Sequence, residues 1–397
     1  MIRPPTRDHH ASVPTCAGFV NLVGDVPELF SKLRSAATIS SGAIADDEAC
    51  SASTRAGNTI ACLSIGEIAG AGQGMAMRNG KMTPLAPGGQ RRPNFGVHMS
   101  AQPRPAGIYP MLYAFFGRDG ALDRAAVRRQ VDACVANGAH GVAVLGLATE
   151  VSKLTEAERH TLVEWVAADL DRRLPLAVTV FGETPEQQIA AGRHAKDFGA
   201  QWLILQPPRS LGSGDAAPLQ FFGSIMDRLD MTLAIQNAPE YIGVGLSVDG
   251  IAALARNHAN FTVLKGEGPV LAIREVIERT DGKLAVFNGR AGLELTDNLR
   301  AGCAGMVPGM DFLDRQSRVF DLMRAGGEAE AEAVYREVLP GIVFAMTSIE
   351  HLVCYGKRIA AHRLGITEVF DRTPALTPTA FGLGCAERIA HSLGALR

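Results

Sequence analysis

The sequence predicts an α/β protein, a (β/α)8 TIM barrel with a C-terminal helical extension. From Gly107 onward, apolar segments typical of buried strands alternate with amphipathic segments typical of helices, the pattern of a parallel sheet. Eight such strands within about 220 residues are what a (β/α)8 barrel requires. An open doubly wound sheet is the alternative, but it usually has fewer strands, and no dinucleotide fingerprint is present. The predicted strands begin at Gly107, His140, Pro175, Trp202, Thr232, Phe261, Leu284 and Gly302.

Helix boundaries between these strands have recognisable signals. Thr155 and Glu158 form a capping box, TEAE, at the start of one helix. Gly138 and Gly199 stand where glycines commonly end helices. Helices are therefore predicted over residues 123–137, 155–171 and 184–198.

After Phe312 the chain becomes helical. The first of these helices completes the barrel, and the loop FDRTPALTPT (370–379) separates the last two. We expect the barrel to occupy residues 99–326 and a small helical bundle to occupy 327–397. The helices are predicted at residues 312–325, 328–346, 347–364 and 378–394.

Residues 1–98 differ in composition from the rest of the chain. They are rich in Ser, Ala, Gly and Thr and show little periodicity, which predicts loop or disorder. We hypothesise that Met99 is the natural start and that the preceding residues come from an over-long gene assignment. N-terminal sequencing of the native protein tests this, and a chain starting at residue 1 would refute it.

Composition narrows the possible partners. The net charge of -2 gives no electrostatic case for nucleic acid or an anionic membrane. The seven cysteines form no CxxC motif, and the ten histidines form no paired ligand set, so neither a zinc site nor another metal site is indicated. Reduced thiols predict a cytoplasmic protein.

The segment FTVLKGEGP (261–269) contains the strongest catalytic candidate. Four residues that favour a buried strand lead directly into Lys265, and an unpaired ammonium group is costly to bury. A desolvated lysine at a strand end is a common amine nucleophile. The alternative is a lysine at the edge of the strand whose amine reaches solvent.

Glu267 is expected beside this lysine. Alternation along a strand places Val263, Lys265 and Glu267 on one face. The carboxylate would favour the charged ammonium, whereas desolvation would favour the neutral amine that attacks a carbonyl. Glu267 is therefore either a proton shuttle that stabilises an iminium or the partner in a structural ion pair.

Other candidates stand at the carboxyl ends of the strands, where barrel active sites lie. The turn that contains Gly146, Ala148 and Thr149 offers backbone N–H groups and a hydroxyl for a substrate carboxylate, although an ordinary turn explains it equally well. Arg290 is a second carboxylate candidate, with a solvated loop arginine as the alternative. The remaining substrate-binding candidates at these ends are Asn237, Gly289 and Val307.

These segments together resemble the dihydrodipicolinate synthase / N-acetylneuraminate lyase family of Schiff-base barrels, over about residues 105–375. The matching segments are GLATEVSKLTEAE (146–158), QNAP (236–239), strand-six Lys265, FNGRAG (287–292) and AGCAGMVPG (301–309). The resemblance implies a Schiff base on Lys265, a 2-oxo acid substrate, no metal or organic cofactor, and a homotetramer.

Several departures from the family pattern bear on the reaction. Gln236 stands where members that make or break a C–C bond generally have a proton-relaying tyrosine. Tyr241 stands at the position of the usual arginine, and Leu147 and Ala148 replace paired threonines. IQNAP and KGEGP resemble the VQDAP and KIETP segments of 2-keto-3-deoxy-pentonate dehydratases, which implies catalytic roles for Gln236 and Glu267 beside Lys265.

We therefore expect a lyase that dehydrates a 2-keto-3-deoxy sugar acid through a Lys265 imine. Dehydration does not require deprotonation of the C4 alcohol, whereas aldol cleavage does, so loss of the tyrosine weakens cleavage more. A pyruvate-dependent aldolase or synthase on the same lysine is the first alternative. A non-catalytic barrel that binds a 2-oxo acid is the second.

Overall fold

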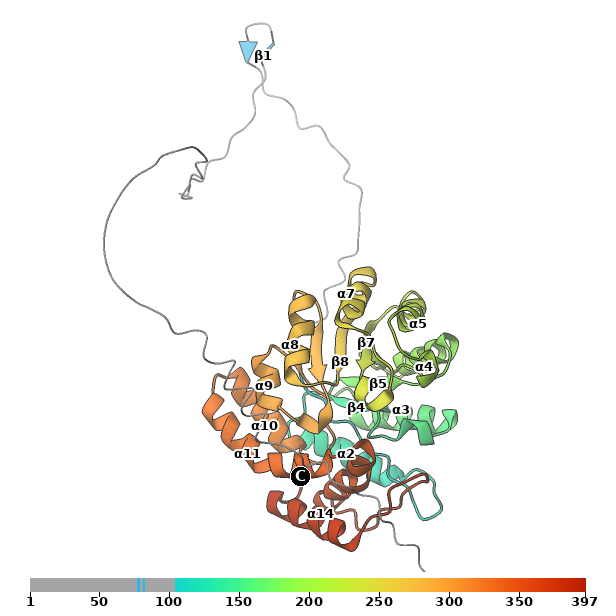
Figure 1. Cartoon of the computed structure of the whole chain (residues 1–397), viewed down its shortest axis with the longest axis vertical. Helices are drawn as coiled ribbons and strands as arrows, with labels where there is room; N and C mark the ends of the chain where they lie inside the picture. Colours follow the sequence, from blue (N-terminus) through green and yellow to red (C-terminus); the bar gives the residue numbers. More distant parts are fainter. Residues whose placement is uncertain (1–76, 79–80, 83–103) are drawn as a thin grey trace, which may run out of the picture. The chain divides into compact units, whose positions relative to one another are not determined.

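The computed structural model describes residues 77–78, 81–82 and 104–397 (Figure 1). Met77–Arg78 (β1) and Lys81–Met82 (β2) pair as antiparallel strands. The described residues from 104 onward belong to a single unit. The proposed start at Met99 and nearly all of the predicted N-terminal extension lie outside the described residues.

The described unit contains a barrel of eight parallel strands. Their order is β3-β10-β9-β8-β7-β6-β5-β4. The ends meet near Met111: the amide of Leu112 donates to the carbonyl oxygen of Ala143 (2.9 Å), and the amide of Ala143 donates to that of Pro110 (3.0 Å). The predicted TIM-barrel fold is confirmed. The strands are β3 Gly107–Ile108, β4 Val142–Val144, β5 Leu176–Val180, β6 Trp202–Leu205, β7 Thr232–Asn237, β8 Phe261–Gly266, β9 Ala285–Asn288 and β10 Gly305–Met306.

Helices surround these strands (Figure 1). The predicted capping box is present, because the hydroxyl of Thr155 accepts from the amide of Glu158, whose carboxylate accepts from the amide of Thr155. Gly138 and Gly199 follow their helices with φ values of 76° and 92°, a region that glycine enters without strain. The helices between strands are α2 Arg124–Ala136, α3 Glu156–Leu170, α4 Pro185–Asp197, α5 Ala216–Met226, α6 Pro239–Ile242, α7 Val248–Asn257, α8 Val270–Arg279 and α9 Leu295–Arg300.

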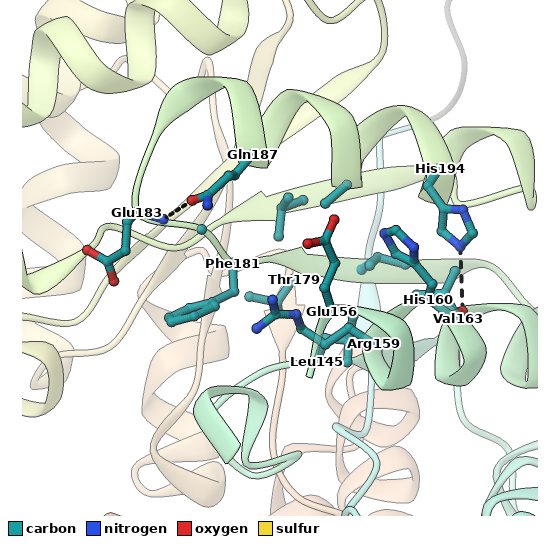
Figure 2. A pocket seen from close by; sticks show the side chains of 14 residues that line it. Leu145, Glu156, Arg159, His160, Val163, Thr179, Phe181, Glu183, Gln187 and His194 are labelled. Carbon is teal, nitrogen blue, oxygen red and sulfur yellow. Dashed lines mark hydrogen bonds between the residues drawn. The ribbon is translucent and has the colours of Figure 1, made fainter. Parts of the chain in front are cut away.

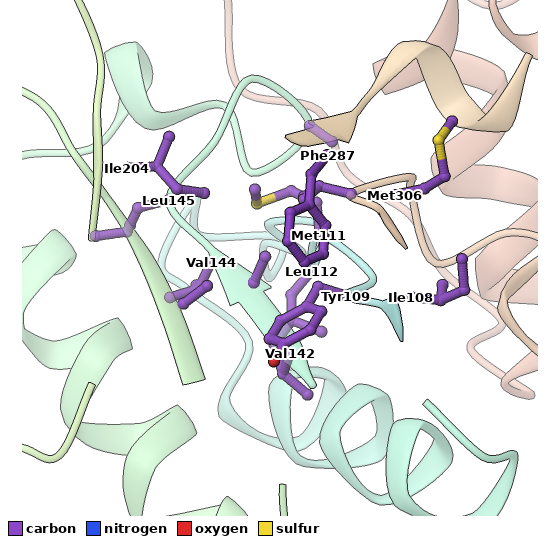
Figure 3. Packing of buried hydrophobic residues seen from close by; sticks show 14 of the residues in the cluster. Ile108, Tyr109, Met111, Leu112, Val142, Val144, Leu145, Ile204, Phe287 and Met306 are labelled. Atoms are coloured by element: carbon purple, nitrogen blue, oxygen red, sulfur yellow. The ribbon is translucent and has the colours of Figure 1, made fainter. Parts of the chain in front are cut away.

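The barrel interior is a packed core rather than a channel. Tyr109 makes edge-to-face contacts with Trp202 and Phe287, with ring centroids 5.4 Å and 5.5 Å apart. Figure 3 shows Tyr109 and Phe287 among the aliphatic side chains of the neighbouring strands. Large side chains that fill a barrel in this way leave room for chemistry only at the strand ends.

The C-terminal helices follow the predicted order. They are α10 Leu313–Arg324, α11 Glu328–Ala345, α12 Ile349–His351, α13 Lys357–Arg363 and α14 Ala380–Leu393. The helix predicted over 347–364 is interrupted by one π-helical stretch, Leu352–Gly356, a local irregularity that hydrophobic periodicity does not report. The boundary proposed at residue 327 stays a prediction. No single helix in the described part of the chain is long and apolar enough to cross a membrane.

A buried tyrosine and a carboxylate join the first strand segment to the last. The hydroxyl of Tyr113 donates to Oδ1 of Asp311 (3.0 Å), while Oδ2 of Asp311 has no partner among the described residues. Burial raises the pKa of Asp311 from 3.8 to about 6. Its ionised form is therefore less stable in the folded protein than in the unfolded chain.

Replacing Asp311 by Asn is expected to stabilise the protein at neutral pH. Above pH 6 the wild-type fold contains an ionised buried carboxylate, which costs on the order of 3 kcal/mol for a pKa raised by about two units. This cost declines as pH falls from 6 towards 4, because Asp311 is then protonated. Denaturant titration of both proteins at pH 7.5 and pH 4.0 measures the effect, and a gain that is equal at the two pH values would contradict it.

Candidate active site

Lys265 and Glu267 form a buried pair at the carboxyl end of β8. Their exposed fractions are 3% and 7%, and Nζ of Lys265 lies 2.6 Å from Oε1 of Glu267. The alternation of side chains along β8 places both on one face, as the sequence predicts. The pair gives an amine, held out of bulk water, with a carboxylate in proton-transfer distance.

Gln236 completes this cluster from the neighbouring strand. It lies in β7 directly opposite Lys265 in the parallel register. Its Nε2 donates to Oε2 of Glu267 (2.9 Å), and its Oε1 has no partner among the described residues. The Glu267 carboxylate is thus held on both oxygens, by an ammonium and an amide.

The loop after β9 approaches this cluster closely. A Cβ atom on Gly289 would lie 2.2 Å from Oε1 of Glu267, so only glycine leaves room for the carboxylate. The next residues, Arg290 and Ala291, have φ values of 52° and 53°, a strained region for residues with a side chain. Such strain commonly marks a functional site, and here it fixes the direction in which Arg290 leaves the backbone.

The Arg290 side chain is only 18% exposed and binds neighbouring side chains. Its Nη1 donates to Oε2 of Glu294 (2.9 Å), and its Nε donates to the hydroxyl of Tyr241 (3.4 Å). Tyr241 belongs to α6, which follows β7, whereas Arg290 follows β9. Because β7 and β9 flank β8 in the barrel, this hydrogen bond crosses the end of the strand that contains Lys265.

In the turn after β4, some of the predicted ligand-binding groups already have partners within the protein, and others do not. The hydroxyl of Thr149 donates to the carbonyl oxygen of Leu112 (2.6 Å) and is fully buried. The amide of Gly146 contacts Sδ of Met111 at 3.2 Å. The amides of Leu147 and Ala148, in contrast, have no acceptor within the described residues. A carboxylate at this turn would therefore meet these two amides rather than the threonine hydroxyl.

Two further candidates have structural partners. The side chain of Asn237 holds the loop before α7 through both the amide and the carbonyl oxygen of Leu246 (2.7 Å and 3.2 Å). Val307 is buried, and its amide donates to the carbonyl oxygen of Asn288 (2.8 Å). The Asn237 side chain thus holds a loop in place, and the Val307 side chain has no polar group.

The mouth of the barrel opens into a cleft of about 970 Å³. Leu147, Phe181 and Gln206, which follow β4, β5 and β6, line this cleft together with Tyr241. Residues of the C-terminal segments 347–354 and 371–376 line it as well. Lys265 does not line this cleft, and Tyr241 connects the cleft to the Lys265 cluster through Arg290 and the adjoining Gly289.

Sequence reasoning missed an ionic cluster at the edge of this cleft. Glu150 is buried, has φ of 59°, and binds Lys153 (2.5 Å) and the fully buried Lys357 of α13. Lys357 also lies 3.4 Å from Asp371. Glu150 directly follows the turn at 146–149, so this cluster attaches that turn to the C-terminal helices.

A second cavity, of about 240 Å³, lies between α3 and α4 (Figure 2). It is lined by Arg159, Thr179 and the rings of His160 and His194, which stack with centroids 4.0 Å apart. None of the predicted site residues lines it. The reactive amine and its carboxylate belong to the barrel mouth instead.

Comparison with known proteins identifies the family of this barrel. The model of the dihydrodipicolinate synthetase family matches residues 104–379. The chain belongs to this family. Its members are lyases, namely aldolases, dehydratases and synthases, and the chain is therefore an enzyme of that class. The family resemblance expected from the sequence is confirmed.

The alignments with curated relatives cover most of each relative's length, but the sequence identities are low. An L-2-keto-3-deoxyarabonate dehydratase of Azospirillum brasilense is 28% identical over 61% of this chain and 80% of its own. A 4-hydroxy-tetrahydrodipicolinate synthase of Methanoculleus marisnigri is 27% identical over 59% and 81%. A probable 2-dehydro-3-deoxy-D-pentonate aldolase of Escherichia coli is 23% identical over 63% and 85%.

Solved structures share the fold. A protein of Pseudomonas aeruginosa described as a dihydrodipicolinate synthetase superimposes with a TM-score of 0.69 at 20% identity, covering 73% of this chain and 99% of that one. A dihydrodipicolinate synthase of Rhodopseudomonas palustris gives a TM-score of 0.66 at 22% identity, covering 73% and 98%. At this identity the likeness defines the architecture alone.

Proposed function

We propose that this enzyme dehydrates a 2-keto-3-deoxy sugar acid through an imine on Lys265. The observation that supports this proposal is the buried Lys265–Glu267–Gln236 cluster. It places the Lys265 amine beside the Glu267 carboxylate. On β7 it has the amide of Gln236, where a relative that cleaves a C–C bond would have the phenol of a tyrosine. The similarity to an L-2-keto-3-deoxyarabonate dehydratase adds support.

Each group in the cluster has a role in this reaction. The Lys265 amine attacks the C2 carbonyl, and loss of water gives a protonated imine that acidifies the C3 hydrogens. Glu267, within 2.6 Å of Nζ, accepts a C3 proton to give an enamine. Return of the nitrogen lone pair then forms the C3–C4 double bond and breaks the C4–O bond. Gln236 holds the Glu267 carboxylate in place, and the amides of Leu147 and Ala148 bind the substrate carboxylate.

A pyruvate-dependent aldolase or synthase remains the second candidate. The observation that favours it is the similarity to an aldolase and to a synthase at 23% and 27% identity. Both reactions would use the same imine. They differ in the product formed from a 2-keto-3-deoxy acid, which is a semialdehyde for the dehydratase and pyruvate for the aldolase.

Borohydride trapping tests the shared step. Wild-type protein is incubated with pyruvate or a 2-keto-3-deoxypentonate, reduced, digested and mapped by mass spectrometry. We expect one reduced adduct, on the peptide that contains Lys265. Absence of an adduct with every 2-oxo acid would exclude both enzyme reactions, and analysis of the unreduced products separates dehydration from cleavage.

A further inference from the structure

Elimination of a C4 hydroxyl requires a proton donor at the leaving oxygen. Hydroxide is a poor leaving group because the pKa of its conjugate acid, water, is about 15.7. Within the Lys265 cluster, Glu267 is committed to the C3 proton, and the Gln236 amide is not an acid. The proton donor is therefore either Glu267, once it has taken the C3 proton, or a third group closer to C4.

Tyr241 is placed to act as this third group. It lines the cleft at the barrel mouth, and its hydroxyl accepts a hydrogen bond from Nε of Arg290 (3.4 Å). Its α6 helix starts two residues after β7, whose Gln236 faces Lys265 in the register. Arg290 directly follows Gly289, which closely approaches the Glu267 carboxylate. The phenol therefore lines the cleft and is linked through Arg290 and Gly289 to the carboxylate beside Lys265.

We propose that Tyr241 is the general acid that protonates the departing C4 hydroxyl, and that Arg290 orients its phenol and stabilises the phenolate that results. This inference rests on the proposed dehydration. The phenol of Tyr241 lies on α6, five residues after Gln236 in the sequence.

The electrostatic surroundings keep this phenol protonated before the reaction. Burial raises the pKa of Tyr241, the hydrogen bond from Arg290 opposes this shift, and the carboxylates of Glu267 and Glu240 add to it. Proton transfer to a departing hydroxide is still favourable, because water is a far weaker acid than a phenol. The guanidinium of Arg290 then faces the new negative charge.

The proton and electron balance is complete. Glu267 takes the C3 proton, and the C3–H electron pair becomes part of the enamine. The C4–O bond breaks with its electron pair on oxygen, which takes the proton of Tyr241 and leaves as water. Glu267 then releases a proton to solvent and the phenolate takes one up. Water hydrolyses the unsaturated iminium and frees Lys265. Proton transfers from C5 to C3 and from the C5 hydroxyl to C4 give the semialdehyde, and the enzyme returns to its starting state.

The test compares two leaving groups in wild-type protein and in Tyr241→Phe. With a 2-keto-3-deoxypentonate, the variant is expected to lose about 10²- to 10⁴-fold in kcat, the usual contribution of a general acid. With the 4-deoxy-4-fluoro analogue, fluoride leaves without a proton, and the variant is expected to stay within about tenfold of wild type. Borohydride trapping of pyruvate on Lys265 is expected to be unchanged.

Tyr335→Phe is the matched control. Its hydroxyl bonds to the carbonyl oxygen of Gly292 (3.1 Å) and the amide of Leu295 (3.3 Å) behind the Arg290 loop, and any loss there should be equal for both substrates. Full activity of Tyr241→Phe on the hydroxy substrate, or an equal loss on both substrates, would overturn the role of Tyr241. Failure of wild-type protein to form any adduct would instead overturn the proposed function.

Discussion

Replacing Lys265 by Arg is expected to abolish turnover of 2-keto-3-deoxy acids. The guanidinium keeps a positive charge beside Glu267 but does not deprotonate in a protein, so no neutral amine is available to attack a carbonyl. The loss should be on the order of 10⁶-fold in kcat, as when the nucleophile of a covalent enzyme is removed. Steady-state kinetics with each product assay, together with borohydride trapping, measures it.

Two controls make this result specific. Lys283→Arg changes an exposed lysine in the loop before β9 and should keep wild-type kinetics. Lys265→Arg should keep its circular dichroism spectrum and elution volume, which separates lost chemistry from lost structure. Residual turnover above about 1% of wild type in a folded Lys265→Arg variant would remove the imine from the mechanism.

The close pairing of Lys265 with Glu267 was predictable because it depends only on local geometry. Side chains two residues apart on a strand share a face, and an apolar strand that ends in a lysine requires a partner for the charge. The barrel was predictable for a related reason, since eight alternating segments leave few ways to bury every strand. These inferences use neighbours in sequence and the spacing between elements.

The rest of the site depends on contacts between distant segments. Glu150 and Lys357 are 207 residues apart, and Tyr241 meets Arg290 across an intervening strand. Nothing in the local pattern at Tyr241 distinguishes a phenol in the cleft from one packed under a helix. The sequence predicts that Thr149 binds a ligand, but in the fold its hydroxyl donates to the carbonyl oxygen of Leu112. Glu150 and Arg290 have left-handed φ values, which change the direction of the chain at these residues. Hydrophobic periodicity does not predict such changes.

Lys357 links the C-terminal helices to the turn that is expected to hold the substrate carboxylate. Its ammonium is fully buried, contacts Glu150, lies 3.4 Å from Asp371, and stands 5.5 Å from the ring centre of Phe116. Glu150 ends the turn in which the amides of Leu147 and Ala148 have no acceptor among the described residues. Loss of the ammonium would leave Glu150 with only Lys153 as a cationic partner among the described residues.

Replacing Lys357 by Met is expected to lower the free energy of unfolding by about 3–5 kcal/mol. Methionine fills a similar volume, so the main effect is that Glu150 loses its fully buried cationic partner and Asp371 loses a nearby ammonium, a change that typically costs this much. The KM for a 2-keto-3-deoxy acid should rise together with this loss, because the carboxylate-binding turn is no longer anchored. Denaturant titration and steady-state kinetics measure the two effects.

Lys153→Met provides the comparison on the same carboxylate. Lys153 is closer to solvent, with 16% of its side chain exposed, and its removal leaves the buried Lys357 contact in place, so a loss near 1 kcal/mol is expected. The double variant Lys357→Met with Glu150→Gln should be more stable than the sum of the single changes predicts, because removing both charges ends the penalty of leaving one unpaired. Equal losses from the two lysine variants would mean that the buried contact does not anchor the turn.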